Sequence, residues 1–412
     1  MTWVLTLNAG SSSLKFALFR GHSASVEQVA IGQIDGLGVA PHLTLRDAKG
    51  DKSEDRALPE AQARDHTSAL DLVLAVLKQH VPEAEIKAVG HRVVHGGVTY
   101  AVPVAITSSL IDELKAFVPL APLHQPHNLA GIETAMRAFP GAIQVACFDT
   151  AFHRAHPWVN DTFALPRYLY DKGVRRYGFH GLSYEYVMQN LREMSPGVAS
   201  SRVVVAHLGN GASMCAIRDG KSVGSSMGFS ALDGLPMGTR PGQLDPGVLL
   251  HLMQHENMSA QQISDLLYKE SGLKGLSGLS SDMRVLETAG TPEAKQAIEY
   301  FVFRVRREIG AMAAILDGID ALVFCGGIGE NANRVRERIC QNMNWIGLSL
   351  DESRNCTNET VISDANSRVK ALVIKTNEEA MIAKHTLAVI ESATMTRQAA
   401  PQRSSTQNHG AF

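Results

Sequence analysis

The first clear folding signal is the stretch Val4-Leu-Thr-Leu-Asn-Ala-Gly-Ser-Ser-Ser-Leu-Lys-Phe-Ala-Leu-Phe19. Its two ends are apolar and β-prone, whereas residues 8–13 between them are all turn-forming, so the stretch predicts a strand, a turn and a second strand. A related pattern returns at residues 203–217, where an apolar run leads into a glycine turn and a second apolar run follows. Two such units, one near the start of each half, predict a duplicated architecture.

Helical and strand patterns alternate along the rest of the chain. Residues 69–77 and 292–316 have the apolar spacing of helices, and residues 88–90 and 144–148 are typical of short strands. Strands interleaved with helices predict an α/β chain with mixed sheets. The 412 residues are enough for two domains, each of about 150–200 residues.

The composition excludes several classes of protein. The formal net charge is -2 at pH 7, so we expect no nucleic-acid partner. No apolar run approaches the roughly 18 residues of a spanning helix, so we expect no membrane segment. The five cysteines are scattered and odd in number, and the start of the chain lacks a basic leader. These features predict reduced thiols in a cytoplasmic protein.

Three glycine turns are candidates for holding phosphate groups. The first, at residues 8–15, offers backbone N–H groups, three hydroxyls and the ammonium of Lys15, although a plain turn is the alternative. The second, His207-Leu-Gly-Asn-Gly-Ala-Ser213, repeats the device without a lysine. The third, at residues 324–331, follows a strand and precedes a helix, which is a nucleotide-site arrangement. We therefore assign Lys15 to an ATP site.

The familiar nucleotide fingerprints do not fit. The segment Gly326-Gly-Ile-Gly-Glu-Asn-Ala332 lacks the third glycine of the dinucleotide motif. The segment ending Gly-Lys-Ser222 resembles a P-loop, but the required first glycine falls on Cys215. A dehydrogenase and a P-loop enzyme are both disfavoured.

Five further features suggest chemistry. Arg92 and Arg240 stand beside glycines in apolar surroundings, which suits planar recognition of a carboxylate or phosphate. Asp149 follows an apolar strand, where α/β folds bind ligands, although an acidic helix cap is the alternative. His180 lies between two glycines, and a satisfied structural histidine is its alternative. The carboxylates of Thr376-Asn-Glu-Glu379 suit Mg²⁺, or else cap a helix.

Together these segments resemble the acetate kinase family, from Val4 to about His385. The motifs that carry the resemblance are Leu7-Asn-Ala-Gly-Ser-Ser-Ser-Leu-Lys-Phe16, His91-Arg-Val-Val-His-Gly-Gly97, Phe148-Asp-Thr-Ala-Phe-His153, Tyr177-Gly-Phe-His-Gly-Leu-Ser183, His207-Leu-Gly-Asn-Gly211, Met237-Gly-Thr-Arg240, Gly326-Gly-Ile-Gly-Glu-Asn331 and Thr376-Asn-Glu-Glu379. The resemblance implies two duplicated ribonuclease-H-like domains with an interdomain cleft, a fold shared with sugar kinases, heat-shock ATPases and actin, and usually a homodimer.

On this basis we expect an N-terminal domain over residues 1–150, completed by a helix from residues 380–392. Residues 151–379 would form a C-terminal nucleotide-binding domain. Residues 393–412 are polar and without periodicity, so a disordered tail is predicted there.

The resemblance also implies roles for individual residues. Asp149 would be the acidic catalytic residue, with His180 and Arg240 stabilising the transition state. Arg92 would bind the substrate carboxylate in a small acyl pocket walled by Val94, Leu123 and Phe179. Asn8 and Glu378 would support Mg²⁺, for which Mn²⁺ can substitute. Besides Lys15, the ATP site would consist of His207, Leu208, Gly209, Asn210, Gly211, Asp282, Met283, Arg284, Gly327, Ile328, Gly329, Glu330 and Asn331.

The implied reaction is reversible, Mg²⁺-dependent, in-line phosphoryl transfer between ATP and acetate, giving acetyl phosphate and ADP. The chain departs from the family at Ser230-Ala-Leu-Asp-Gly234, where the family commonly has Thr-Pro-Leu-Glu-Gly. Ala231 thus replaces a proline that lines the acyl pocket, which leaves a propionate or butyrate kinase as an alternative. An alternative of another class is a sensor ATPase that binds nucleotide without transfer, but such a protein has no need of a carboxylate clamp.

Overall fold

The computed structural model describes residues 1–10, 13–122 and 124–399. Within these residues, the N-terminal sheet has eight strands in the order β5-β4-β3-β2-β1-β6-β8-β7. Strand β1 pairs antiparallel with β2 and parallel with β6, which confirms the two predicted strands, whereas residues 11–12 of the predicted turn lie outside the described residues. The strands are β1 (Thr2–Ala9), β2 (Ser13–His22), β3 (Ser25–Asp35), β4 (His42–Asp47), β5 (Lys52–Ala57), β6 (Ile86–Val93), β7 (Val104–Ala105) and β8 (Ile143–Phe148).

The C-terminal sheet repeats this pattern. In the described part of the chain its five strands have the order β11-β10-β9-β12-β13. They are β9 (Arg202–Leu208), β10 (Ala212–Arg218), β11 (Lys221–Ser225), β12 (Ala321–Cys325) and β13 (Lys370–Val373). As in the run β3-β2-β1-β6-β8, the first three strands are antiparallel and the other two are parallel to the central one. The predicted α/β fold with mixed sheets is confirmed, and one strand order occurs twice.

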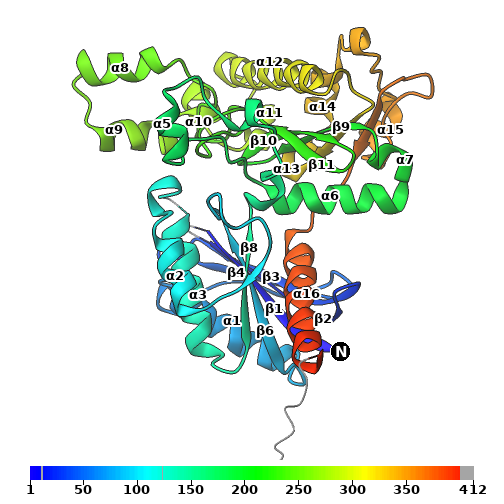
Figure 1. Cartoon of the computed structure of the whole chain (residues 1–412). Coiled ribbons are helices and arrows are strands. Elements are labelled where there is room, and N and C mark those ends of the chain that lie inside the picture. Colours follow the sequence, from blue (N-terminus) through cyan, green and yellow to red (C-terminus); the bar gives the residue numbers. More distant parts are fainter. Residues whose placement is uncertain (11–12, 123, 400–412) are drawn as a thin grey trace, which may run out of the picture.

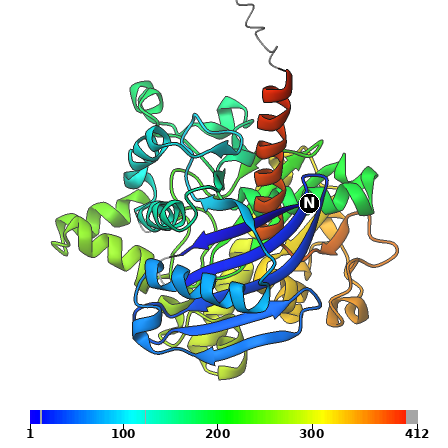
Figure 2. The ribbon, with the colours of Figure 1, turned by 90° about the horizontal axis from the view of Figure 1, so that it is seen from below.

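Helices cover both faces of the N-terminal sheet (Figure 1). On one face, α1 (His66–His80) and α3 (Gln125–Ala138) share a core with Leu5 and Leu7 of β1. On the other, α16 (Glu378–Ala399) packs on Val4 of β1 and Phe19 of β2. Figure 2 shows α16 beside these strands, away from α1. Because both faces are covered, β1 is buried along most of its length instead of alternating with solvent.

The predicted disordered tail is wrong in its first part. Helix α16 continues to Ala399, so residues 393–399 are helical. Alanine and methionine at positions 393 and 395 favour a helix. The helix also elongates from a segment already fixed on the sheet, so no new nucleus is required. Residues 400–412 of the predicted tail lie outside the described residues.

The C-terminal sheet is also covered on both faces. Helix α6 (Gly181–Met194) packs Tyr184 and Val187 on one face, and it contacts α16 of the other half as well. Helix α12 (Pro292–Ile315), predicted from its apolar spacing, covers the opposite face through residues such as Phe301 and Val305.

The other helical segments are short. They are α2 (Ser108–Lys115), α4 (Trp158–Asp161), α5 (Arg167–Asp171), α7 (Pro196–Ala199), α8 (Pro246–Gln254), α9 (Ala260–Asp265), α10 (Gly272–Ser277), α11 (Met283–Ala289), α13 (Gly326–Asn331), α14 (Asn333–Cys340), α15 (Glu352–Cys356), a π-helical turn (Leu266–Glu270), and 3-10 turns at Glu60–Gln62, Val118–Leu120, Ala151–His153 and Asn344–Ile346. In the described part of the chain, none of the helices combines the length and apolar character that crossing a membrane requires.

Candidate active site

A cleft of about 530 Å³ lies between the two sheets. It is reached by strand ends and turns of both halves, since its lining residues are Asn8, Gly10, Ser13, Lys15, Arg92, Val94, His124, Asp149, Phe179, His180, His207, Gly209, Asn210, Gly211, Met227, Ala231, Arg240, Gly326, Gly327, Thr376, Glu378 and Glu379. A second cavity of about 990 Å³ adjoins it and shares Lys15, Gly209, Asn210 and Gly327. Crevices at strand ends between two α/β halves are where such folds bind ligands.

Arg92 and Asp149 form a buried pair at the floor of this cleft. Arg92 stands near the end of β6 and Asp149 follows the neighbouring strand β8, so strand pairing brings them together. Arg92 Nη2 lies 2.6 Å from Asp149 Oδ2, and Arg92 Nε lies 3.0 Å from Oδ1. Burial raises the pKa of Asp149 to about 6, although the guanidinium opposes this shift. The carboxylate is therefore ionised at neutral pH and fixes the orientation of Arg92.

The same guanidinium is connected to two further polar residues. Arg92 Nη1 donates to Asn8 Oδ1 at 3.2 Å, and Glu378 Oε2 lies 3.8 Å from Arg92 Nε. Burial alone would lower the pKa of Arg92, but Asp149 and Glu378 raise it above its ordinary value. Arg92 is thus a permanent cation held from three sides, which suits a carboxylate or phosphate ligand.

Arg240 is a second cation, and it lacks an acidic partner. Its Nη1 donates to the carbonyl oxygen of Ala231 at 2.8 Å. Within the described residues it takes part in no ion pair. Burial is the main reason that its pKa is lowered, but a guanidinium stays charged at neutral pH. Its uncompensated charge makes this part of the cleft attractive to an anion.

His180 precedes α6 in a left-handed conformation, with φ 59° and ψ 26°. The glycines on either side permit this turn, since a Cβ on Gly181 would lie 2.3 Å from the carbonyl oxygen of Asp149 and one on Gly178 would lie 2.6 Å from the His153 ring. Burial is the largest of the effects that lower the pKa of His180 well below its ordinary value. The imidazole is therefore neutral at pH 7.

The side chains of His180 and Arg240 both lie next to Gly211. An ideal Cβ on Gly211 would lie 3.3 Å from His180 Nε2 and 3.4 Å from Arg240 Nη2. The absence of a side chain at this position leaves space next to two potential hydrogen-bond donors. Such convergence is what a ligand with several anionic oxygens requires.

The glycine turns expose backbone to the two cavities. A Cβ on Gly327 would meet no heavy atom within 4 Å, so its backbone is open to a ligand. Lys15, exposed on β2, reaches both cavities. The third predicted glycine turn is in fact the short helix α13. Its start is held in place by Glu330, whose Oε1 accepts hydrogen bonds from the backbone N–H groups of Gly326 and Thr376.

Most of the predicted site residues line one of the two cavities. Asp282, Met283, Arg284, Ile328 and Asn331 line the larger one, and the predicted catalytic and substrate residues line the cleft. Three predicted ATP residues line neither cavity: Leu208 and Gly329 are buried, and Glu330 is turned toward backbone. A contiguous motif includes such residues because neighbours on a strand or helix point to different sides. Leu123 lies outside the described residues.

Glu379 and His124 are two further titratable residues of the cleft. Glu379 belongs to the pair of carboxylates predicted to suit Mg²⁺, and burial, followed by the charge of Glu378, raises its pKa. His124 was not predicted, because a lone histidine in a loop carries no pattern. It is a neutral imidazole, since burial and then Arg240 lower its pKa to about 3.

Oxygen ligands for a divalent cation are present beside Arg92. Among the described residues, no group of three or more His, Cys, Asp or Glu side chains could hold a metal ion by itself. Mg²⁺, however, is usually held by one or two carboxylates together with substrate phosphates and water. Glu378 and Glu379 line the cleft close to Asn8, so these residues fit that mode of binding.

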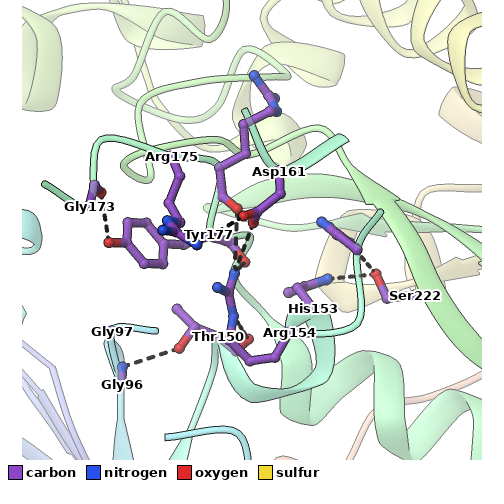
Figure 3. A network of polar contacts seen from close by, with 12 residues as sticks. Gly96, Gly97, Thr150, His153, Arg154, Asp161, Gly173, Arg175, Tyr177 and Ser222 are labelled. Carbon is purple, nitrogen blue, oxygen red and sulfur yellow. Dashed lines mark hydrogen bonds and ion pairs between the residues drawn. The ribbon is translucent and has the colours of Figure 1, made fainter. Parts of the chain in front are cut away.

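A polar network next to the cleft fixes its C-terminal wall (Figure 3). Arg154 Nη2 donates to the carbonyl oxygen of Tyr177 at 2.9 Å, and its Nε donates to that of Thr150 at 3.4 Å. Asp161 lies between Arg154 and Arg175, at 3.8 and 3.3 Å. The network connects the segment after Asp149 to the segment before His180. It therefore holds these two site residues at a fixed separation.

Known proteins of one family are similar to this chain over nearly its whole length. Residues 3–384 match the model of the Acetokinase family. The chain is 60% identical over 395 residues to an acetate kinase of Methylocella silvestris, covering 94% of this chain and 98% of that relative. The crystal structure of Porphyromonas gingivalis acetate kinase is 40% identical with a TM-score of 0.83, covering 95% of this chain and 100% of that one. A propionate kinase from Francisella tularensis is 36% identical with a TM-score of 0.87, covering 94% and 100%.

Proposed function

The chain belongs to the acetokinase family, and we propose that it is an acetate kinase that transfers a phosphoryl group reversibly between ATP and acetate. The observation that carries this proposal is the convergence of His180 and Arg240 over Gly211, in a cleft whose floor is the Arg92–Asp149 pair. Arg92 is held by the carboxylate of Asp149. Arg240 can interact with the negative charge that develops in the transition state. This division suits a reaction in which a carboxylate attacks a phosphoryl group.

The two substrates would occupy the two cavities. The larger one, with Asp282 and Ile328 in its lining, would take the nucleotide, and its phosphates would pass Lys15 and the backbone of Gly209 and Gly327 into the cleft. Arg92 would hold the acetate carboxylate, with the acetate methyl group against Val94 and Phe179. A small apolar wall beside one guanidinium fits a short carboxylate.

In the forward reaction a carboxylate oxygen forms a bond to the γ-phosphorus, and the bond from that phosphorus to the bridging oxygen of ADP breaks. Acetate is already ionised at pH 7, so no general base is required. Charge spreads over the equatorial phosphoryl oxygens, where Arg240 and the N–H of His180 would donate. Asp149 would act by holding Arg92 in position.

A divalent cation would be held by Glu378 and Asn8, and Glu379 is an additional candidate. Mg²⁺ bound to the phosphates would neutralise part of their charge. Mn²⁺ prefers similar oxygen ligands, so we expect it to substitute.

Two further properties belong to this proposal. All five cysteines are free and far from forming pairs, which suits a reducing cytoplasm. Large apolar side chains are exposed on α8 and α12, among them Leu250, Met253 and Phe303. Such side chains suit contact with a second copy of the chain, and we propose a homodimer.

We also propose the division into two domains at about residue 150. Its support is that α16 returns to the N-terminal sheet, whereas the strands β9 to β13 form a sheet of their own. Residues 1–150 with 380–392 would move as one unit against residues 151–379, closing the cleft on its substrates.

A propionate kinase is the second candidate, and Ala231 favours it. Ala231 lines the cleft, and a side chain smaller than proline leaves room for a longer acid. A sensor ATPase would not need Arg92 paired with Asp149 beside an apolar wall.

The test is a coupled assay in both directions. Purified protein with ATP, Mg²⁺ and acetate, propionate or butyrate should give ADP and acyl phosphate, and acetyl phosphate with ADP should give ATP. We expect the highest kcat/KM for acetate and overlap with propionate, since one methylene is worth about 1–3 kcal/mol. ATP hydrolysis without transfer to any acid would disprove the proposal.

A further inference from the structure

The side chain of His180 is the end of a short hydrogen-bonded chain that begins in the protein core. His180 Nδ1 lies 2.8 Å from Ser213 Oγ, and the same oxygen is hydrogen-bonded to the hydroxyl of Tyr184. Ser213 belongs to β10 and Tyr184 to α6, and neither is exposed to solvent. The other ring nitrogen, Nε2, faces the cleft over Gly211.

The direction of these hydrogen bonds follows from counting protons. Each hydroxyl has one proton to donate. Among the described residues, the hydroxyl of Tyr184 has Ser213 Oγ as its only hydrogen-bond partner. A buried O–H that donates to nothing has lost its hydrogen bond to water without a replacement, which is unfavourable. Tyr184 therefore donates to Ser213, and Ser213 is left to donate to His180 Nδ1.

The opposite arrangement leaves a proton without an acceptor. If Nδ1 carried the proton, Ser213 Oγ would accept it, and either the Ser213 proton or the Tyr184 proton would then lack an acceptor among the described residues. The chain thus favours a neutral imidazole with its proton on Nε2. That N–H is the one that faces the cleft.

We propose that Ser213 and Tyr184 are positioning residues that keep His180 in its Nε2–H tautomer and direct this donor at the phosphoryl group in transfer. The proposal rests on the proposed function for the identity of the acceptor, but not for the tautomer. It assigns to two buried residues of the C-terminal half a role in transition-state stabilisation that neither performs by direct contact with substrate.

A second histidine–serine pair lies beside the residue that precedes His180 and offers a control. His153 Nε2 lies 2.9 Å from the carbonyl oxygen of Phe179, and its Nδ1 lies 2.8 Å from Ser222 Oγ, as Figure 3 shows for His153 and Ser222. Ser222 is fully buried, like Ser213, but in the described part of the chain its hydroxyl is hydrogen-bonded to His153, His156 and Cys215 and not to His180. Ser222→Ala therefore removes an equally buried hydroxyl without touching the proposed chain.

The first experiment is ¹⁵N NMR of the full chain with labelled histidine, in which the His180 signals are assigned by their loss in His180→Gln. We expect a protonated Nε2 and an unprotonated Nδ1 in the wild-type protein. In Ser213→Ala and Tyr184→Phe we expect both tautomers, whereas Ser222→Ala should keep the wild-type pattern. A wild-type His180 with its proton on Nδ1 overturns the proposal, whether or not the variants fold.

The second experiment measures kcat and KM separately. Loss of one aligned donor should lower kcat of Ser213→Ala roughly 10- to 100-fold, with the KM for acetate almost unchanged. Tyr184→Phe should have the same effect in weaker form. Its control is Tyr100→Phe, which removes a hydroxyl that donates to Glu113 and belongs neither to the cleft lining nor to the polar network, and it should keep wild-type kinetics.

Equal kcat values for Ser213→Ala and the wild-type protein overturn the proposal. So does an equal decrease in Ser213→Ala and Ser222→Ala, because a loss common to any buried hydroxyl is structural. If the wild-type protein has the expected tautomer but transfers no phosphoryl group in the coupled assay, the proposed function fails while the tautomer assignment stands.

Discussion

The two sheets use the same strand order but serve the cleft in different ways. In the N-terminal sheet, Asn8 pairs with Lys15 across the first turn, and the neighbouring strands contribute Arg92 and Asp149. In the C-terminal sheet, the corresponding pair is His207 and Ser213. Lys15 is exposed in the cavities, whereas Ser213 is buried beneath His180.

This difference shows how a duplicated fold can divide its work. The N-terminal half brings charged side chains to the cleft, which suits a substrate held by its carboxylate. The C-terminal half mainly brings glycine backbone, at Gly209, Gly211 and Gly327, which suits a chain of phosphates. Arg240 and His180 are two of the side chains that it also contributes, and both lie next to Gly211. The predictions below test this division, beginning with the largest expected effect.

Removal of the Arg92 guanidinium should have the largest effect on activity. Arg92→Ala deletes the proposed carboxylate ligand and leaves Asp149 buried without its cation. We expect kcat/KM for acetate to fall by about 10²–10³-fold or more, as for loss of an aligned donor to the reacting group. Steady-state assays at saturating ATP measure this.

The matched control for Arg92→Ala is Arg20→Ala, which breaks an exposed ion pair with Glu27 and should keep wild-type kinetics. Circular dichroism of both variants separates lost chemistry from lost folding. If Arg92→Ala is as active as Arg20→Ala, Arg92 does not bind the carboxylate of acetate.

Addition of a single methyl group at Gly211 should disturb the part of the cleft that the C-terminal half contributes. In Gly211→Ala the new Cβ lies 3.3 Å from His180 Nε2, so the imidazole must shift by a few tenths of an ångström, and it lies 3.4 Å from Arg240 Nη2, in van der Waals contact. We expect kcat to fall about 10- to 30-fold, because small misplacements of catalytic groups are costly. Gly197→Ala is the control, since its Cβ meets no heavy atom within 4 Å. If the two alanine variants have equal kcat, the space over Gly211 is not used by the reaction.

A decrease in pH should reduce the activity of the enzyme before it unfolds the protein. Burial raises the pKa of Asp149 to about 6, so the carboxylate is lost as the pH falls through that value and Arg92 loses its anchor. One unit below the pKa, roughly a tenth of the molecules remain ionised, so kcat/KM at pH 5 should be about tenfold lower than at pH 7.

The sign of the linked stability change is opposite to that of the activity change. Because the folded pKa of Asp149 exceeds its unfolded value, protonation of this group stabilises the folded state as the pH falls below about 6. The activity loss should therefore occur while circular dichroism is unchanged. In Asp149→Asn the remaining kcat/KM should no longer decrease between pH 7 and pH 5. If it decreases as in the wild-type protein, the decrease is caused by the protonation of another group.

Sequence patterns predicted those elements of the two halves that depend on neighbouring residues. Both strand–turn–strand units and the long helix α12 lie where the apolar spacing placed them, because neighbouring residues determine such elements. The pairing of Ser213 with Tyr184 was not predictable, because a strand residue and a helix residue approach each other only in the folded chain. The helical residues 393–399 were missed because a polar segment without periodicity resembles a tail unless the helix before it is known to be anchored.

The smallest expected effect concerns Ala231, which lines the cleft in the proposed acyl pocket. Ala231 belongs to the C-terminal half, and its carbonyl oxygen holds Arg240 while its side chain lines the cleft. Ala231→Val should fill space that a longer acid needs and leave the carbonyl group in place. We expect kcat/KM for propionate to fall about 3- to 10-fold relative to acetate, within the range that one or two methyl groups provide. The KM for ATP is the internal control and should stay unchanged. If both acids are affected equally, Ala231 acts through Arg240, and the C-terminal half then contributes to acid binding by orienting a charge and not by its shape.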